Sequence, residues 1–226
     1  MASISIFKEI ILLIKKDLAL EWRQRFAIQS VMLYMGCAVF VCYLSIGIKG
    51  TRLVANTWSA LFWIILLFAA INAVTKSFLQ EDKQRNLYYY TLVSPQALIL
   101  SKIIYNSLLV SLLSFIGFVL YLGVMGNPVQ ELGQFTVCLL LGSFGFSSTF
   151  TLISAIASKA GNNSSLMAIM SIPLIIPLLL VLMKFAKNAI DGLPWSSSFD
   201  EMIQLASLNI LLVALSYILF PFLWRS

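Results

Sequence analysis

Six long apolar stretches set the pattern of hydrophobic and polar positions along this chain. They cover residues 26–48, 54–74, 103–125, 132–157, 166–183 and 203–224, and none contains Asp, Glu, Lys or Arg. A helix needs about 20 apolar residues to cross the hydrocarbon core of a bilayer. The pattern therefore predicts an all-α membrane protein with six transmembrane helices, formed as one domain over residues 1–226.

Residues 1–25 carry a different pattern, with apolar side chains at steps of three or four. These are Ile4, Phe7, Ile11, Ile14, Leu18 and Trp22, and the spacing places them on one face of a helix. Lys8, Glu9, Lys16 and Arg23 lie away from that face. The favoured interpretation is an amphipathic helix that lies in the membrane interface just before the first span. A helix packed on a partner protein is the alternative.

The fifth apolar stretch holds two prolines, Pro173 and Pro177. A proline lacks the backbone N–H that an α-helix uses to bond the carbonyl four residues earlier. The pair therefore predicts a kinked or broken helix in this span.

Composition and charge place the chain in a membrane and give its orientation. Of the 226 residues, 60% are hydrophobic and 11% are charged, whereas a soluble domain has about 25% charged residues. The net charge of +6 does not indicate nucleic-acid binding, because basic residues are expected at membrane surfaces. With the N-terminus inside, eleven Lys and Arg residues fall on the cytoplasmic side and four on the outer side. Both termini are therefore expected in the cytoplasm.

The residue types used by membrane enzymes and ion-coupled carriers are missing from the predicted spans. Ionisable residues at membrane depth usually mark a functional site, and the six stretches have none. The chain has no histidine, no C-x-x-C pair and no P-loop motif for ATP. A serine nucleophile would have no base. The sequence therefore predicts a non-catalytic subunit with no metal site and no directly bound cofactor.

Neutral polar residues gather in the fourth span instead. Its segment LGSFGFSSTFTLISAIAS holds nine Gly, Ser and Thr residues among 18. Small residues allow close helix packing, and hydroxyls bond across helices. Packing is the favoured interpretation, and a weakly polar lining of a substrate path is the alternative. A haem ligand among Met167, Met170 and Met183 is a further alternative.

The segment between the second and third spans is long and rich in charges and tyrosines. It contains QEDKQRNLYYYTLVSP, in which the charged residues Glu81, Asp82, Lys83 and Arg85 precede Leu87, Tyr88, Tyr89 and Tyr90. Ser77 and Gln80 have the spacing of a capping box, and Ser94 followed by Pro95 suits the start of the next helix. Aromatic residues rimmed by charges are typical of protein interfaces. The pattern indicates a short cytoplasmic helix within residues 76–95 that docks a partner. A belt of tyrosines at the lipid headgroups is the alternative.

Three stretches, together with the six-span layout, carry a family resemblance. They are KKDLALEWRQR (residues 15–25), FLQEDKQRNLYYYTLVSPQALILSK (residues 78–102) and NNSSLMAIMSIPLIIPLLL (residues 162–180). The whole layout resembles the membrane subunits of ABC exporters of the ABC-2, or type V, kind. Within that class the stretches resemble haem exporter protein B, the permease subunit of the cytochrome c maturation complex.

The resemblance implies an elbow helix, a coupling helix and a set of partners. The elbow helix is residues 1–25, with Lys16, Asp17, Leu18, Trp22, Arg23 and Arg25 in its matching part. The coupling helix between spans two and three is implied to dock a separate ATPase subunit, which binds the ATP. Haem is implied to be held by partners: a haem-handling membrane protein, a small membrane subunit and a haem chaperone. The expected place is the bacterial inner membrane, among membrane lipids, and a homodimer is left open.

ATP hydrolysis would then drive haem delivery, or release of the haem-loaded chaperone, on the outer face. The chain departs from the family pattern at Asn86 and Tyr88, where Gly and Glu are common, and this changes the charge of the docking face. Two other functions are left open by the residues alone. One is the permease of another ABC-2 exporter, which moves a lipid-linked sugar or a drug, and the other is a membrane scaffold without a transport role.

Overall fold

The computed structural model describes residues 6–24, 26–46, 54–79, 93–159 and 164–225. Its elements in chain order are α1 (Ile6–Gln24), α2 (Phe26–Ile46), α3 (Ala55–Leu79), α5 (Pro95–Met125), α6 (Leu132–Lys159), α7 (Ser164–Ile190), the short 3-10 helix η2 (Trp195–Ser198) and α8 (Phe199–Arg225). The described residues contain no strand.

Six of these helices, α2, α3, α5, α6, α7 and α8, are long and apolar enough to cross a membrane. The prediction of an all-α, six-span membrane protein is therefore confirmed. Five helices extend beyond the predicted spans. The two longest extensions are at the start of α5, which begins at Pro95 instead of residue 103, and at the end of α7, which continues to Ile190 instead of residue 183. Both extensions include lysines that have carboxylate partners, because Lys102 lies beside Asp17 and Lys184 beside Glu201.

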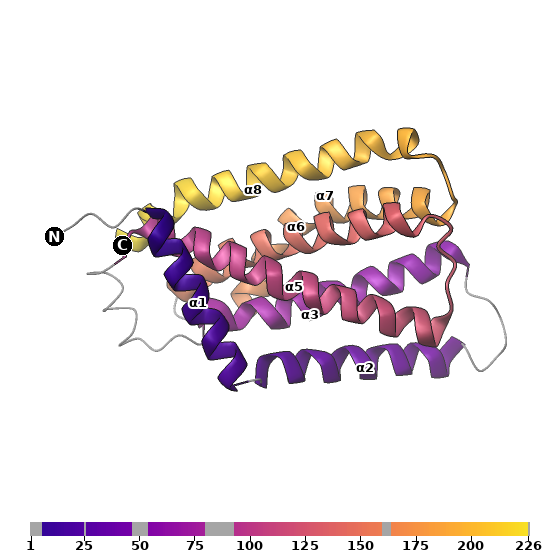
Figure 1. Cartoon of the computed structure of the whole chain (residues 1–226), viewed down its shortest axis with the longest axis horizontal. Coiled ribbons are helices and arrows are strands. Elements are labelled where there is room, and N and C mark those ends of the chain that lie inside the picture. Colours follow the sequence, from indigo (N-terminus) through magenta and orange to yellow (C-terminus); the bar gives the residue numbers. More distant parts are fainter. Residues whose placement is uncertain (1–5, 25, 47–53, 80–92, 160–163, 226) are drawn as a thin grey trace.

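Helix α6 lies at the centre of the bundle and packs against α3, α5, α7 and α8. In its apolar segment 72% of the residues are buried, whereas only 17% are buried in that of α2. The many small residues of α6 allow four neighbours to approach it closely. Figure 1 shows the long helices running alongside one another, with the start of α1 and the end of α8 at the same end of the bundle. Helix α1 crosses that end at a steep angle to α2 (Figure 1).

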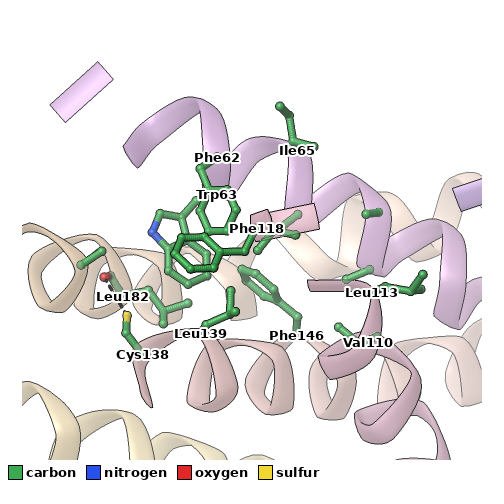
Figure 2. Close-up of a cluster of buried hydrophobic side chains, with 14 of the residues drawn as sticks. Phe62, Trp63, Ile65, Val110, Leu113, Phe118, Cys138, Leu139, Phe146 and Leu182 are labelled. Atoms are coloured by element: carbon green, nitrogen blue, oxygen red, sulfur yellow. Dashed lines mark hydrogen bonds between the residues drawn. The ribbon is translucent and has the colours of Figure 1, made fainter. Parts of the chain in front are cut away.

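An aromatic cluster joins α3, α5 and α6 within the bundle. Figure 2 shows Phe62 and Trp63 of α3 gathered with Phe118 of α5 and Phe146 of α6. The ring of Phe135, from the start of α6, stacks on Phe118 with 4.9 Å between the centroids. Stacked and edge-to-face pairs of this kind contribute beyond the area they bury. The cluster therefore fixes the contacts among three of the spans.

The two prolines of the fifth span lie inside one continuous helix. Helix α7 passes through Pro173 and Pro177 without a break, so the prediction of a broken helix is wrong. Each proline removes one backbone hydrogen bond from α7. Membrane helices tolerate this loss where neighbouring helices pack on them, and α7 packs on α6 and α3. The predicted kink stays a prediction.

Replacing Gly145 with alanine is expected to destabilise the contact among α6, α7 and α8. A Cβ atom there would lie 2.7 Å from Asn209 Oδ1 and 2.7 Å from a methyl carbon of Leu178. Gly123 of α5 is the matched control, because a Cβ atom there meets nothing within 4 Å. We expect the Gly145 variant to be less stable than the Gly123 variant by about 1–3 kcal/mol, measured by thermal unfolding in detergent. Equal stability of the two variants would contradict this packing.

Candidate functional site

Helix α1 presents three faces to different surroundings. Its apolar stripe is exposed, with Phe7, Leu18 and Trp22 at 69%, 48% and 76% exposure. Leu13 and Asp17 are buried on a second face. The side chains of Lys8 and Arg23 are exposed. An exposed apolar stripe next to the first span is what a helix in the lipid interface requires, so these exposures support the predicted elbow placement.

The buried face of α1 contacts the beginning of α5, and we call this contact the elbow junction. It consists of Glu9, Asp17 and Glu21 of α1 and of Ser94, Lys102 and Tyr105 of α5. The three contacts follow the same order along both helices. The two helices therefore advance in the same direction through the junction, which holds them together over several turns.

The pair of Asp17 and Lys102 is the buried charge pair of the elbow junction. The Lys102 Nζ atom lies 3.3 Å from Asp17 Oδ2, and the two side chains are only 4% and 6% exposed. Lys16 lies on the other side of the same carboxylate, with its Nζ atom 3.0 Å from Asp17 Oδ1. A charge in a shielded place is tolerated when an opposite charge and hydrogen bonds accompany it. Asp17 thus forms ion pairs with two lysines, Lys16 of α1 and Lys102 of α5.

Glu9 fixes the first turn of α5 from outside that helix. Ser94 donates its hydroxyl to Glu9 Oε2 at 2.7 Å and its backbone N–H at 3.2 Å. Ser94 is the N-cap residue of α5, followed by Pro95, yet its side chain makes no capping bond within α5. A carboxylate near a helix N-terminus is stabilised by the helix dipole. Glu9 therefore supplies the negative charge at this helix end, and the prediction that α5 starts at Ser94-Pro95 is confirmed.

The third contact of the elbow junction joins Glu21 to Tyr105. The Tyr105 hydroxyl donates to Glu21 Oε2 at 3.2 Å. Tyr105 is 7% exposed and lies one turn beyond Lys102 along α5.

Sequence reasoning found only part of the elbow junction. Of the predicted elbow residues, Asp17 is buried in it, Lys16 contacts the Asp17 carboxylate, and Leu18, Trp22 and Arg23 are exposed. Arg25 lies outside the described residues. Glu9 was placed only away from the apolar face, and Glu21 and the three α5 partners were missed. The spacing of acidic residues 9, 17 and 21, in steps of eight and four, was the available signal, because it places them on one face of a helix.

The predicted coupling residues Glu81, Asp82, Lys83, Arg85, Leu87, Tyr88, Tyr89 and Tyr90 all lie outside the described residues. The structure describes the helices on both sides of them. Helix α3 continues through Ser77 to Leu79, so the prediction that a short helix begins at Ser77 is wrong. On the other side, α5 begins at Pro95 within the elbow junction. The segment is therefore bracketed by two helices that run into the core of the bundle.

The hydroxyl-rich span forms a polar seam between α5 and α6. Asn106 donates to Thr151 Oγ1 at 2.9 Å, and Ser107 donates to Ser147 Oγ at 3.1 Å. All four side chains are buried. Ser143 and Thr149 bond carbonyls of their own helix. These contacts favour packing over the lining of a path.

The end of the bundle opposite the elbow junction is held together by contacts among α6, α7 and α8. Gln134, which is fully buried, donates to the Leu193 carbonyl at 2.7 Å. The Lys184 Nζ atom lies 2.7 Å from Glu201 Oε1, and the Glu201 side chain is 3% exposed. Gly192 has a φ of 70°, which favours glycine, and forms the turn before η2 and α8. The segment from Asp191 to Pro194 therefore connects α7 to η2 and α8 through a turn.

The described residues include Cys, Asp and Glu side chains, which are residue types that ligate metal ions. Within them, no group of three or more His, Cys, Asp or Glu side chains is placed to hold a metal ion. Met170 and Met183 lie exposed on α7. The side chain of Met167 lies outside the described residues.

Comparison with family models decides the relationship of this chain. The model described as CcmB protein matches residues 8–222, which is nearly the whole chain. The chain belongs to the CcmB protein family. A search of curated proteins finds no match.

Membership of the CcmB family gives the function at a coarse level. The family is that of haem-exporting ABC transporter permeases of cytochrome c maturation. Such a permease belongs to an ABC transporter with an ATPase partner. The matched residues include nearly all of α1 and of the six spans, and residues 80–92, so the family relationship extends over both the elbow junction and the predicted coupling segment.

Proposed function

We propose that this chain is the permease through which a separate ATPase subunit drives haem handling for c-type cytochrome maturation. The family match over residues 8–222 is the observation that carries the proposal. ATP hydrolysis in the partner promotes haem delivery, or release of a haem-loaded chaperone, on the outer face of the bacterial inner membrane. The permease itself contributes no catalytic group.

The elbow junction connects the segment on which the ATPase is proposed to act with the rest of the bundle. Residues 80–92 connect α3 to α5, and α5 is attached at its first residues to Glu9 and Asp17 of α1. A displacement of this segment by the ATPase therefore moves α5 and the elbow helix together. Helix α5 also packs on α6, and it is bonded to that central helix through Asn106 and Ser107. The motion thus reaches the middle of the bundle through packed helices.

The proposal includes four kinds of partner, of which the family relationship supports the ATPase. They are the ATPase, a haem-handling membrane protein, a small membrane subunit and the haem chaperone. A second copy of the chain is compatible with the exposed surface of α2, of which only 17% of the apolar segment is buried. Haem binds to these partners, so the permease needs no iron ligand of its own.

Reversing the charge of Glu81 and Asp82 to lysine is expected to lower recovery of the ATPase about tenfold, since loss of a few interface contacts has that effect. The double change Asp191→Lys and Asp200→Lys is the control, because it reverses two exposed carboxylates at the other end of the bundle. The measurement is affinity purification in mild detergent, with mass spectrometry and an absorption spectrum of the eluate.

Each result of this purification has a defined meaning. An ATPase together with haem-handling membrane proteins supports the proposal, and loss of the ATPase only in the Glu81 and Asp82 variant supports the docking surface. An ATPase without haem partners moves the function to another ABC-2 exporter. Recovery of neither partner by the unaltered chain contradicts the proposal and leaves a membrane scaffold.

A further inference from the structure

A groove of about 600 Å³ opens between α1, α2 and α5, beside the elbow junction. Its apolar walls are formed by Leu18 and Trp22 of α1, Ile28 of α2, and Leu108, Leu109 and Leu112 of α5. Leu108 and Leu112 are 55% and 54% exposed, so the groove lies on the lipid-facing side of the bundle. Its volume is within the range of about 300–1,000 Å³ that holds one small amphiphilic molecule.

The polar lining of the groove comes from Glu21, Gln29 and Tyr105. Tyr105 precedes Leu112 by seven residues, which is about 10 Å along the axis of α5. Beside the elbow helix the lining therefore combines these polar side chains with the apolar Leu18 and Trp22, and farther along α5 it is formed by leucines alone. This arrangement matches a lipid that places its headgroup beside α1 and one hydrocarbon chain along α5.

Glu21 gives the polar end of the groove a preference for positive charge. One of its oxygens accepts a hydrogen bond from Tyr105. The other, Oε1, is shielded from solvent and accepts no hydrogen bond from any group in the part of the chain that the structure describes. A shielded carboxylate oxygen without a donor is destabilising. A protonated amine would supply both the donor and the opposite charge, whereas a headgroup with phosphate alone would add a second negative charge.

We propose that this groove binds one lipid of the leaflet on the elbow side, and that the lipid carries a protonated amine in its headgroup. The ammonium group donates to Glu21, and one acyl chain lies against Leu108, Leu109 and Leu112. The site requires only this chain and a bilayer, so the lipid proposal can be tested independently of the proposed ATPase partnership.

Photo-crosslinking in nanodiscs tests the proposed lipid site. The full chain is placed in bilayers that contain phosphatidylethanolamine and phosphatidylglycerol in equal amounts. A photoreactive group in the acyl chain is carried by one lipid or the other, with identical tails. Mass spectrometry then locates the labelled peptides. We expect the phosphatidylethanolamine probe to label the part of α5 around Leu109 about fivefold more than the phosphatidylglycerol probe, since hydrogen bonds to charged groups are the stronger ones.

Matched variants separate the headgroup contact from the acyl-chain contact. Glu21→Gln keeps an acceptor for Tyr105 but removes the charge, so it should abolish the preference between the two probes. Glu131→Gln, at the outer end of the bundle, should leave the preference unchanged. Leu112→Trp should lower labelling by both probes because it fills the groove, whereas Leu120→Trp changes the same residue type on the same helix outside the groove lining.

Three outcomes would overturn the proposal. They are equal labelling by the two probes in the unaltered chain, an unchanged preference in Glu21→Gln, and labelled peptides that never include α5. A cross-link from α5 to a second copy of the chain would also overturn it, because the groove would then be a protein interface. The first comparison needs no variant, so it stays informative if a variant fails to fold.

Discussion

Replacing Asp17 with alanine is expected to lower the free energy of unfolding by about 3–5 kcal/mol, the usual cost of removing one partner of a buried charge pair. Asp17 is 6% exposed and its carboxylate lies between Lys102 and Lys16. Without it, the charge of Lys102 stays at a shielded place and loses this carboxylate partner. The measurement is thermal unfolding of the purified chain in detergent, together with protease digestion of α1, which should become faster.

Two further variants show whether the charge pair itself causes the loss. Lys16→Ala should have a small effect, because Lys16 is 31% exposed and pairs near the surface. The double change Asp17→Leu and Lys102→Met should recover most of the stability, since an apolar pair of similar size often replaces a buried ion pair without loss. If Asp17→Ala and Lys16→Ala have equal effects, the buried pair does not hold α1 in place.

Hydrophobic patterning was sufficient to predict the six spans and most of their boundaries. The starts of α2 and α6 and the end of α5 fall at the predicted residues 26, 132 and 125. The errors occur where a helix continues past a charged residue. Lys102 and Lys184 ended the apolar stretches in the sequence, but each has a carboxylate partner on another helix, Asp17 and Glu201. These partners are far away in sequence, so a pattern along the chain does not reveal them.

The functional site was predicted less well than the fold, for a related reason. The sequence distinguished the apolar face of α1 from its polar side but could not divide the polar side into a packed part and a solvated part. Asp17 was singled out through a family resemblance, whereas its role depends on Lys102 of α5. Glu9 has the same residue type as any solvated acid, and only its position beside Ser94 makes it part of the site. The groove beside Glu21 depends on three helices and has no signature in any one of them.

The side chain of Phe135 is the second position at which a single change is expected to have a large effect. It is fully buried in α6 and contacts Trp58, Phe62 and Trp63 of α3 and Phe118 of α5, with ring centroids 4.9 to 6.3 Å away. Alanine would leave a cavity where three helices meet. Transfer from water contributes little between helices that are already in lipid, so packing supplies most of the effect.

We therefore expect Phe135→Ala to cost about 3 kcal/mol, the lower end of the range for such changes in soluble proteins. Phe115→Ala in α5 removes the same side chain from a lipid-exposed position that is 52% exposed, and it should cost little because lipid fills the space. Phe135→Leu should retain most of the stability. Thermal unfolding in one detergent compares all three variants. Equal losses for Phe135→Ala and Phe115→Ala would mean that the aromatic cluster does not bind α3, α5 and α6 together. Of these two sets of contacts, only the polar seam of Asn106 and Ser107 would then transmit a motion of the coupling segment from α5 to α6.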